Sequence, residues 1–262
     1  MIFRQELRFQ WLSWLTWLLS LLVLIVLFMS VFPLFEEEAE EFAIMLETLP
    51  KFMTAAIGMD FQELFTYQGY LAFTNSFMKV IYAVLSALWG LQICGRETIN
   101  RMGEFLFCKP HGRGRVILQK ILAGIVLILL LNLSIFGAYL SLKAKYDGNL
   151  GDWHVTLQAS LLDLEIQLFF FSIGAVLGMS LKRIKNPVAI ASGIAFFFFI
   201  LTMLARIVQR EWVSKLTPFY YAEQLRLLTN DLTVKDSLIL LGASVSLLVA
   251  GSLYFIQKDV EA

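Results

Sequence analysis

Polar side chains within the long apolar stretches of this 262-residue sequence are the first candidates for chemistry, because such groups are costly inside a membrane. Lys79 lies in one such stretch and follows Thr74, Asn75 and Ser76. An ammonium group beside polar neighbours suits the lining of a substrate path, so Asn75 and Lys79 are candidate path residues. The alternative, which we favour for Lys79, is that its long side chain reaches the membrane surface near an acidic segment.

Other polar residues in apolar stretches have simpler structural explanations. Asn132 is expected to hydrogen-bond to a neighbouring helix, and it is the third candidate for the substrate path. Asp163, Glu165 and Arg206 lie near the ends of their stretches. For these three residues, a structural ion pair or exposure at the membrane surface is favoured over contact with a substrate.

The sequence carries no arrangement that indicates enzymatic catalysis. It has no Ser/His/Asp or Cys/His pattern, no H-E-x-x-H, and no G-x-x-x-x-G-K-[ST] run that would hold ATP phosphates. His111 and His154 are far apart, and the predicted topology places them on opposite sides of the membrane, which argues against a shared metal site. No catalytic residue, metal ligand or cofactor is therefore predicted in this chain, and zero net charge gives no indication of nucleic-acid binding.

The composition indicates a chain that lies in lipid. Residues of hydrophobic type make up 58% of the sequence, charged residues 16%, and the mean hydropathy is +0.72. A helix crosses a hydrocarbon core of about 30 Å with about 20 apolar residues. We therefore predict an all-α integral membrane protein, with residues 1–262 as a single transmembrane domain. The predicted spans are approximately 12–35, 71–94, 116–142, 161–181, 188–208 and 236–257.

The first ten residues and the loop charges bear on topology. Apolar residues in 1–10 recur at helical spacing, away from Arg4 and Arg8, which suits an N-terminal interfacial helix. A plain extension of the first span is equally compatible. Lys and Arg are concentrated in the short segments 95–115 and 182–187, so the positive-inside rule predicts that both termini are cytoplasmic.

The segment between the second and third spans, ETINRMGEFLFCKPHGRGRVILQK, has the features of a surface helix. Residues 97–109 can form about three turns, in which Glu97 and Arg101 make a favourable i, i+4 pair. Pro110 disfavours helix at the preceding residue, and residues 111–115 supply a basic, glycine-containing turn. The segment is predicted to lie at the cytoplasmic face, either as an amphipathic helix that meets a partner or as a plain surface loop.

This segment resembles a motif of the membrane subunits of bacterial ATP-binding cassette exporters of the ABC-2 type. That motif has Glu, a Gly-Thr pair, a second Glu, two or three apolar residues, Pro-x-x-Arg and a Lys seven residues later. Arg101 and Met102 stand where the family has Gly-Thr, so the chain departs from the motif at these two positions. The matching residues are Glu97, Glu104, Phe105, Leu106, Pro110, Arg113 and Lys120.

The resemblance implies a function and a set of partners. In that family the helix after the second span is a coupling helix that docks on a separate ATPase subunit, which binds the ATP and Mg²⁺. Two membrane subunits, as a homodimer or a paralogous heterodimer, complete the transporter in the bacterial cytoplasmic membrane. The seven matching residues would then couple this chain to the ATPase, with helix 97–109 as the coupling helix.

The resemblance also limits what this chain is expected to transport. The cargo implied is hydrophobic or amphipathic, such as a peptide, an antibiotic or a lipid. An ATP-independent channel or secondary transporter is the alternative, but the two related halves with broken spans that it predicts are not evident in the sequence.

Two further features concern packing and shape. Gly174 and Gly178 are spaced for close approach of the fourth span to another helix. The outer segments 36–69 and 209–235 are hypothesised to form a small external cap over the exit.

Overall fold

The computed structural model of this chain describes residues 2–37, 65–96, 113–148, 153–181, 183–208, 210–223 and 233–257. All regular elements in these ranges are helices, and six candidate spans are long and apolar enough to cross a membrane. This confirms the prediction of an all-α fold with six membrane-spanning helices. The predicted coupling helix, approximately 97–109, lies outside the described residues.

The helices differ from the predicted ranges mainly at their ends. Residues 2–10 form the first turns of a continuous helix that reaches Ser30, so the N-terminal residues extend the first span and are not a separate interfacial helix. The fourth span begins at Trp153, before the predicted residue 161. The helices are α1 (Ile2–Ser30), α2 (Phe32–Glu37), α5 (Tyr67–Cys94), α8 (Arg113–Tyr146), α9 (Trp153–Ser180), α10 (Pro187–Val208), α11 (Glu211–Ser214), α12 (Pro218–Tyr221) and α14 (Val234–Gln257).

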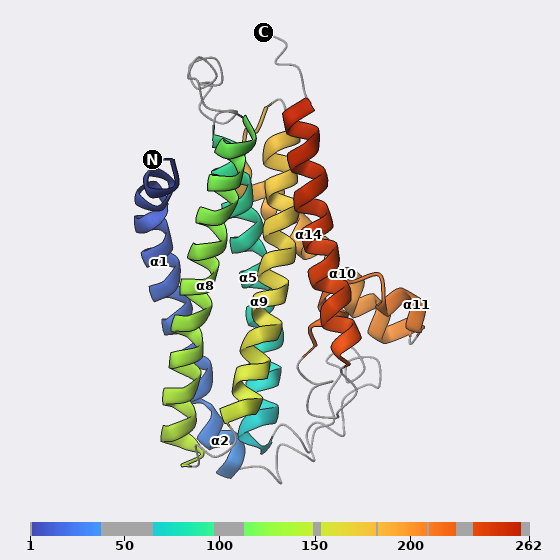
Figure 1. The fold of residues 1–262 in the computed structure, drawn as a ribbon. Helices are drawn as coiled ribbons and strands as arrows, with labels where there is room; N and C mark the ends of the chain where they lie inside the picture. The colour runs from blue at the N-terminus through green and yellow to red at the C-terminus, as the bar shows by residue number, and fades with distance from the viewer. Residues whose placement is uncertain are drawn as a thin grey trace.

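The long helices stand side by side, with α5 in the interior of the bundle (Figure 1). The start of α1 and the end of α14 lie at the same end, which we call the terminal end, and the opposite end is the distal end. Helices α5 and α9 both run from the distal to the terminal end, so they are parallel neighbours. Helix α5 is buried along most of its length, whereas α1, α10 and α14 each bury a smaller part of their surface.

The parallel pair α5 and α9 makes backbone contact, which glycine alone permits. A Cβ atom at Gly174 would lie 2.1 Å from the carbonyl oxygen of Ala87, and one at Gly178 would lie 2.9 Å from the amide nitrogen of Gly95. Gly90 faces the backbone of α9 in the same way. The close helix approach predicted from Gly174 and Gly178 is therefore confirmed, and α5 is the partner.

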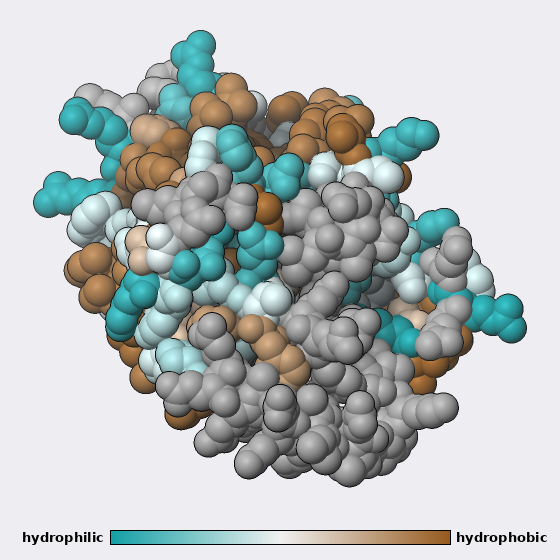
Figure 2. Space-filling view, turned by 90° about the horizontal axis from the view of Figure 1, so that it is seen from below, coloured by the Kyte–Doolittle hydropathy of each residue, from teal (hydrophilic) through white to brown (hydrophobic). Residues whose placement is uncertain are grey.

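Helix α1 shows how the outer helices meet both protein and lipid. Its buried residues recur every three or four positions, and the buried Trp14 indole donates a hydrogen bond of 3.0 Å to the carbonyl of Leu127 on α8. Leu12, Leu19 and Leu27 are exposed on the other side. A view from the distal end shows hydrophobic residues on several sides of the outer rim, as expected of a surface that meets lipid (Figure 2).

Local signals in the sequence set where two of the long helices begin. The Thr66 hydroxyl accepts a hydrogen bond of 3.1 Å from the amide of Gly69, which caps the start of α5. Pro187 opens α10, where its missing N–H costs nothing, and the side chain of Asn186 accepts from the Ala189 amide at 3.2 Å. These caps sit at opposite ends of the bundle, as expected for an up-and-down arrangement.

The glycine contact between α5 and α9 predicts a specific sensitivity to a single methyl group. Gly174→Ala should lower the free energy of unfolding by about 1–3 kcal/mol, because the backbone of Ala87 cannot move aside without shifting α5. The measurement is an SDS unfolding titration of the purified protein in detergent micelles.

Gly193→Ala is the matched control, since a Cβ atom at Gly193 in α10 would meet no atom within 4 Å. That change should leave stability equal or raise it by about 0.5–1 kcal/mol through helix propensity. Equal effects of the two substitutions would contradict the close contact between α5 and α9.

Candidate functional site

A buried network of polar side chains joins α5, α8 and α9 in the distal half of the bundle. The amide nitrogen of Asn75 donates to both carboxylate oxygens of Asp163, at 3.0 and 2.7 Å. The hydroxyl of Tyr139 on α8 donates to the amide oxygen of Asn75 at 3.2 Å. All three residues are buried, so each hydrogen bond acts in a medium of low dielectric.

Two further tyrosines extend this network along α5. The hydroxyl groups of Tyr82 and Tyr139 lie 3.1 Å apart, and the Tyr67 hydroxyl donates to the backbone carbonyl of Tyr139 at 3.2 Å. Asn75 and Tyr82 are seven residues apart, which places them on one face of the helix. The network therefore fixes the rotation of α5 against α8 and α9.

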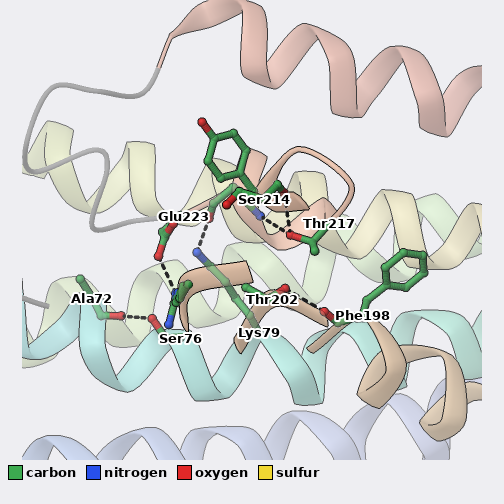
Figure 3. Close-up of polar contacts among 11 residues, drawn as sticks. Ala72, Ser76, Lys79, Phe198, Thr202, Ser214, Thr217 and Glu223 are labelled. Atoms are coloured by element: carbon green, nitrogen blue, oxygen red, sulfur yellow. Dashed lines mark hydrogen bonds and ion pairs between the residues drawn. The ribbon is translucent and has the colours of Figure 1, made fainter. Parts of the chain in front are cut away.

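Lys79 lies one helical turn from Asn75 and is 3% exposed. Its ammonium group donates a hydrogen bond to the backbone carbonyl of Ala222 (Figure 3). Asp163, Glu165 and Glu223 are close enough to interact with it electrostatically. The prediction that Lys79 reaches the membrane surface is therefore wrong, because the chain around Ala222 folds back beside α5 and supplies a partner for the charge.

The segment that supplies this partner, residues 210–223, follows α10. Its first part, with α11, stands outside the bundle (Figure 1), and its second part, from Thr217, re-enters the bundle. It contains α11 and α12, and the Thr217 hydroxyl caps α12 by accepting from the Tyr220 amide at 3.3 Å (Figure 3). Phe219 is buried with its ring centroid 5.5 Å from that of Phe170 and 6.4 Å from that of Phe199. Thr217, Pro218 and Phe219 are therefore enclosed by protein.

The outer segment 209–235 was hypothesised to belong to an external cap, and its residues 217–222 pack into the bundle. Arg206 at the end of α10 pairs with Glu223, which ties the end of the re-entrant segment to α10. Most of the hypothesised external cap, residues 38–64 and 224–232, lies outside the described residues.

The remaining intramembrane candidates have structural partners. Asn132 donates to the backbone carbonyl of Ser160 at 3.1 Å, and the Ser160 hydroxyl donates back to Asn132 at 2.8 Å. This confirms the predicted bond between Asn132 and a neighbouring helix. For Asp163, Glu165 and Arg206 a structural ion pair or exposure at the membrane surface was expected. Arg206 forms such an ion pair with Glu223, whereas Asp163 is fully buried and Glu165 is 8% exposed, so surface exposure does not apply to these two carboxylates.

A second polar cluster lies at the terminal end, next to the predicted coupling segment. The carboxylate of Glu6 on α1 lies 3.1 Å from the guanidinium of Arg96 and 3.8 Å from the ammonium of Lys120. The Lys120 ammonium also donates to the backbone carbonyl of Ile93 at 2.9 Å. Residues from α1, α8 and the end of α5 therefore meet around one buried carboxylate.

The structure places only part of the predicted coupling set. Arg113 is the first residue of α8, and Lys120 is buried against α1 and α5. The other five predicted coupling residues, Glu97, Glu104, Phe105, Leu106 and Pro110, lie outside the described residues. Lys120 thus holds helices together in this structure, and its ammonium group is not on the surface.

Sequence reasoning missed Glu6, although a signal for it exists. Glu6 precedes Gln10, Trp14 and Leu18 at intervals of four, and these residues form the buried stripe of α1. An acidic residue that continues a buried stripe needs a cation nearby. Arg96 and Lys120 supply this charge.

Comparison with known families decides what kind of protein carries these two clusters. The family model described as "Multidrug efflux system permease Rv1217c, C-terminal domain" matches residues 5–255. The chain belongs to this family. Its members are membrane permeases of ABC-type exporters, so this chain is a multi-pass transporter subunit and not itself an enzyme. Comparisons with curated proteins and with solved structures found no match.

The bond between Lys79 and Ala222 predicts how this permease holds its re-entrant segment. Lys79→Met should leave the Ala222 carbonyl without its charged donor, which is worth about 1.5–3 kcal/mol, and should release the segment. A cysteine placed by Ala222→Cys, in a background with Cys94→Ala and Cys108→Ala, should then react with a maleimide about tenfold faster or more.

Trp212→Cys in the same background is the control, because Trp212 is 68% exposed and should react quickly with or without Lys79. If Lys79→Met left the labelling rate of the cysteine at position 222 unchanged, the ammonium group would not be what holds this segment.

Proposed function

We propose that this permease is the membrane subunit of an ATP-driven exporter in which a separate ATP-binding cassette ATPase acts on segment 97–112. The family match supports the exporter assignment, and the ABC-2-like motif in this segment supports the docking site. ATP and Mg²⁺ bind to the ATPase in this proposal. Both chain termini and the segment then lie on the cytoplasmic side.

The observation that carries the proposal is the position of α5. Its terminal end leads directly into segment 97–112, and its body is the buried central helix that contacts α1, α8, α9 and α10. Lys79 on the same helix holds the re-entrant segment through the Ala222 carbonyl. A displacement of segment 97–112 by the ATPase would therefore reach the distal half of the bundle through one rigid helix.

ATP supplies the bias between two arrangements of the helices. An ATPase that binds the inward-open and outward-open arrangements with different affinity shifts their populations by that difference. Asn75, Lys79 and the chain around Ala222 lie together in the distal half, where an exit would open. We place the cargo path beside this network, and we assign Asn132 to helix packing at its edge.

The cargo we propose is hydrophobic or amphipathic, such as a peptide, an antibiotic or a lipid. The family name describes multidrug efflux, and the described bundle has largely apolar outer helices through which such cargo can enter from lipid. A second membrane subunit, identical or paralogous, completes the exporter.

Co-purification and cargo-stimulated ATP hydrolysis test this proposal. The chain is expressed with an ATP-binding cassette ATPase encoded by a neighbouring gene, and the complex is isolated and placed in vesicles. Glu104→Gln and Arg113→Gln should reduce cargo-stimulated ATP hydrolysis by about tenfold, which corresponds to about 1.4 kcal/mol of lost coupling.

Arg183→Gln is the control, since Arg183 is an exposed arginine at the same end but in the turn between α9 and α10. It should leave stimulation unchanged. Full stimulation in both motif variants, or transport that an ion gradient drives without any ATPase, would contradict the proposal.

A further inference from the structure

The carboxylate of Glu6 lies where the two flanks of segment 97–112 meet. Arg96 immediately precedes the segment, and Lys120 lies two helical turns after Arg113, at which α8 begins. Glu6 reaches both cations from α1, which is far away in the sequence. Its side chain is therefore a bridge between three separate helices.

The carboxylate is enclosed by further contacts that fix its position. Glu6 is 5% exposed and Lys120 is 2% exposed, so their charges have little access to water. The guanidinium of Arg96 also lies over the ring of Phe9, 4.6 Å from its centroid. One turn deeper, the amide of Gln10 donates to the side chain of Gln92 at 3.4 Å.

The rest of α1 is joined to the bundle in a way that extends this bridge. The Trp14 indole binds the Leu127 carbonyl of α8, and near the distal end the Tyr70 hydroxyl of α5 donates to the Phe28 carbonyl at 2.9 Å. Helix α1 thus follows α5 and α8 along its length, and Glu6 provides its ionic link to them. A buried charge that loses its partner is strongly destabilising, so separating Glu6 from its cations is unfavourable.

We propose that Glu6 is a positioning residue for ATP coupling. It holds the end of α5 and the start of α8 at a fixed separation, so that a push on segment 97–112 moves α1, α5 and α8 as one body. Without this carboxylate, the segment moves but the helices follow it incompletely. This inference rests on the proposed function, because it concerns how a displacement caused by the ATPase is transmitted to the helices.

The first experiment measures cargo transported per ATP hydrolysed, in vesicles that contain the complete transporter. Glu6→Gln keeps the shape of the side chain and removes the charge. It should reduce transport per ATP by about fivefold or more. Arg8→Gln is the matched control, since Arg8 is exposed on the other face of the same turns, and it should stay within about twofold of the unchanged chain.

A purely structural role is distinguished by the double variant Glu6→Gln with Lys120→Gln. This pair removes both buried charges, so the protein should regain part of the thermal stability that Glu6→Gln alone loses, the remainder being the lost hydrogen bond from Lys120 to the Ile93 carbonyl. Transport per ATP should remain low, because the tie to Arg96 is still absent. Recovery of transport together with stability would overturn the positioning role, as would normal transport per ATP in Glu6→Gln.

A second measurement separates this inference from the proposed function. Thermal unfolding of the isolated permease in detergent is compared for Glu6→Gln, Arg96→Gln and the double variant. The two single effects should not add, since both break the same contact. Additive losses of thermal stability would overturn the bridge itself. Non-additive losses in a permease that binds no ATPase would overturn only the proposed function.

Discussion

The backbone contact between α5 and α9 is the constraint on which the other features of the described bundle depend. Gly174 and Gly178 let the two helices touch along parallel paths, and this contact places α5 in the interior. Because α5 is buried along most of its length, its polar side chains are stabilised chiefly by partners within the protein. Asn75 and Tyr82 have partners on α9 and α8, and Lys79 binds the carbonyl of Ala222, which follows α12.

Polar contacts consequently hold α5 in its distal half and just beyond its terminal end. In the distal half, Asn75 binds Asp163 and Lys79 binds the Ala222 carbonyl. At the terminal end, the Glu6 carboxylate forms ion pairs with both Arg96 and Lys120. These contacts turn a single helix into a connection between segment 97–112 and the re-entrant segment 210–223. In the proposed exporter, this connection couples ATP hydrolysis at the terminal end to opening at the distal end.

The sequence predicts the spans well because length and apolarity are local properties, and the glycine spacing predicts the close packing of α9. It fails for Lys79, since the partner of that ammonium is a backbone carbonyl more than a hundred residues away, which no local pattern indicates. It also fails to place residues 210–223, which were hypothesised to belong to an external cap and of which Thr217, Phe219 and Ala222 are buried in the bundle. Glu6 was missed because an acidic residue near a terminus usually meets water, and only the burial of its stripe indicates otherwise.

The central claim is that a displacement of segment 97–112 by the ATPase reaches the re-entrant segment through α5. The direct test places spin labels at Trp212 on the re-entrant segment and at Leu161 on α9, which are both exposed, in the assembled transporter. The distance distribution between them is measured by pulsed electron paramagnetic resonance, without nucleotide and with ATP trapped on the ATPase. The account predicts that ATP shifts this distribution, and that Glu6→Gln reduces the shift. An identical distribution in both nucleotide states, with the ATPase bound, would contradict it.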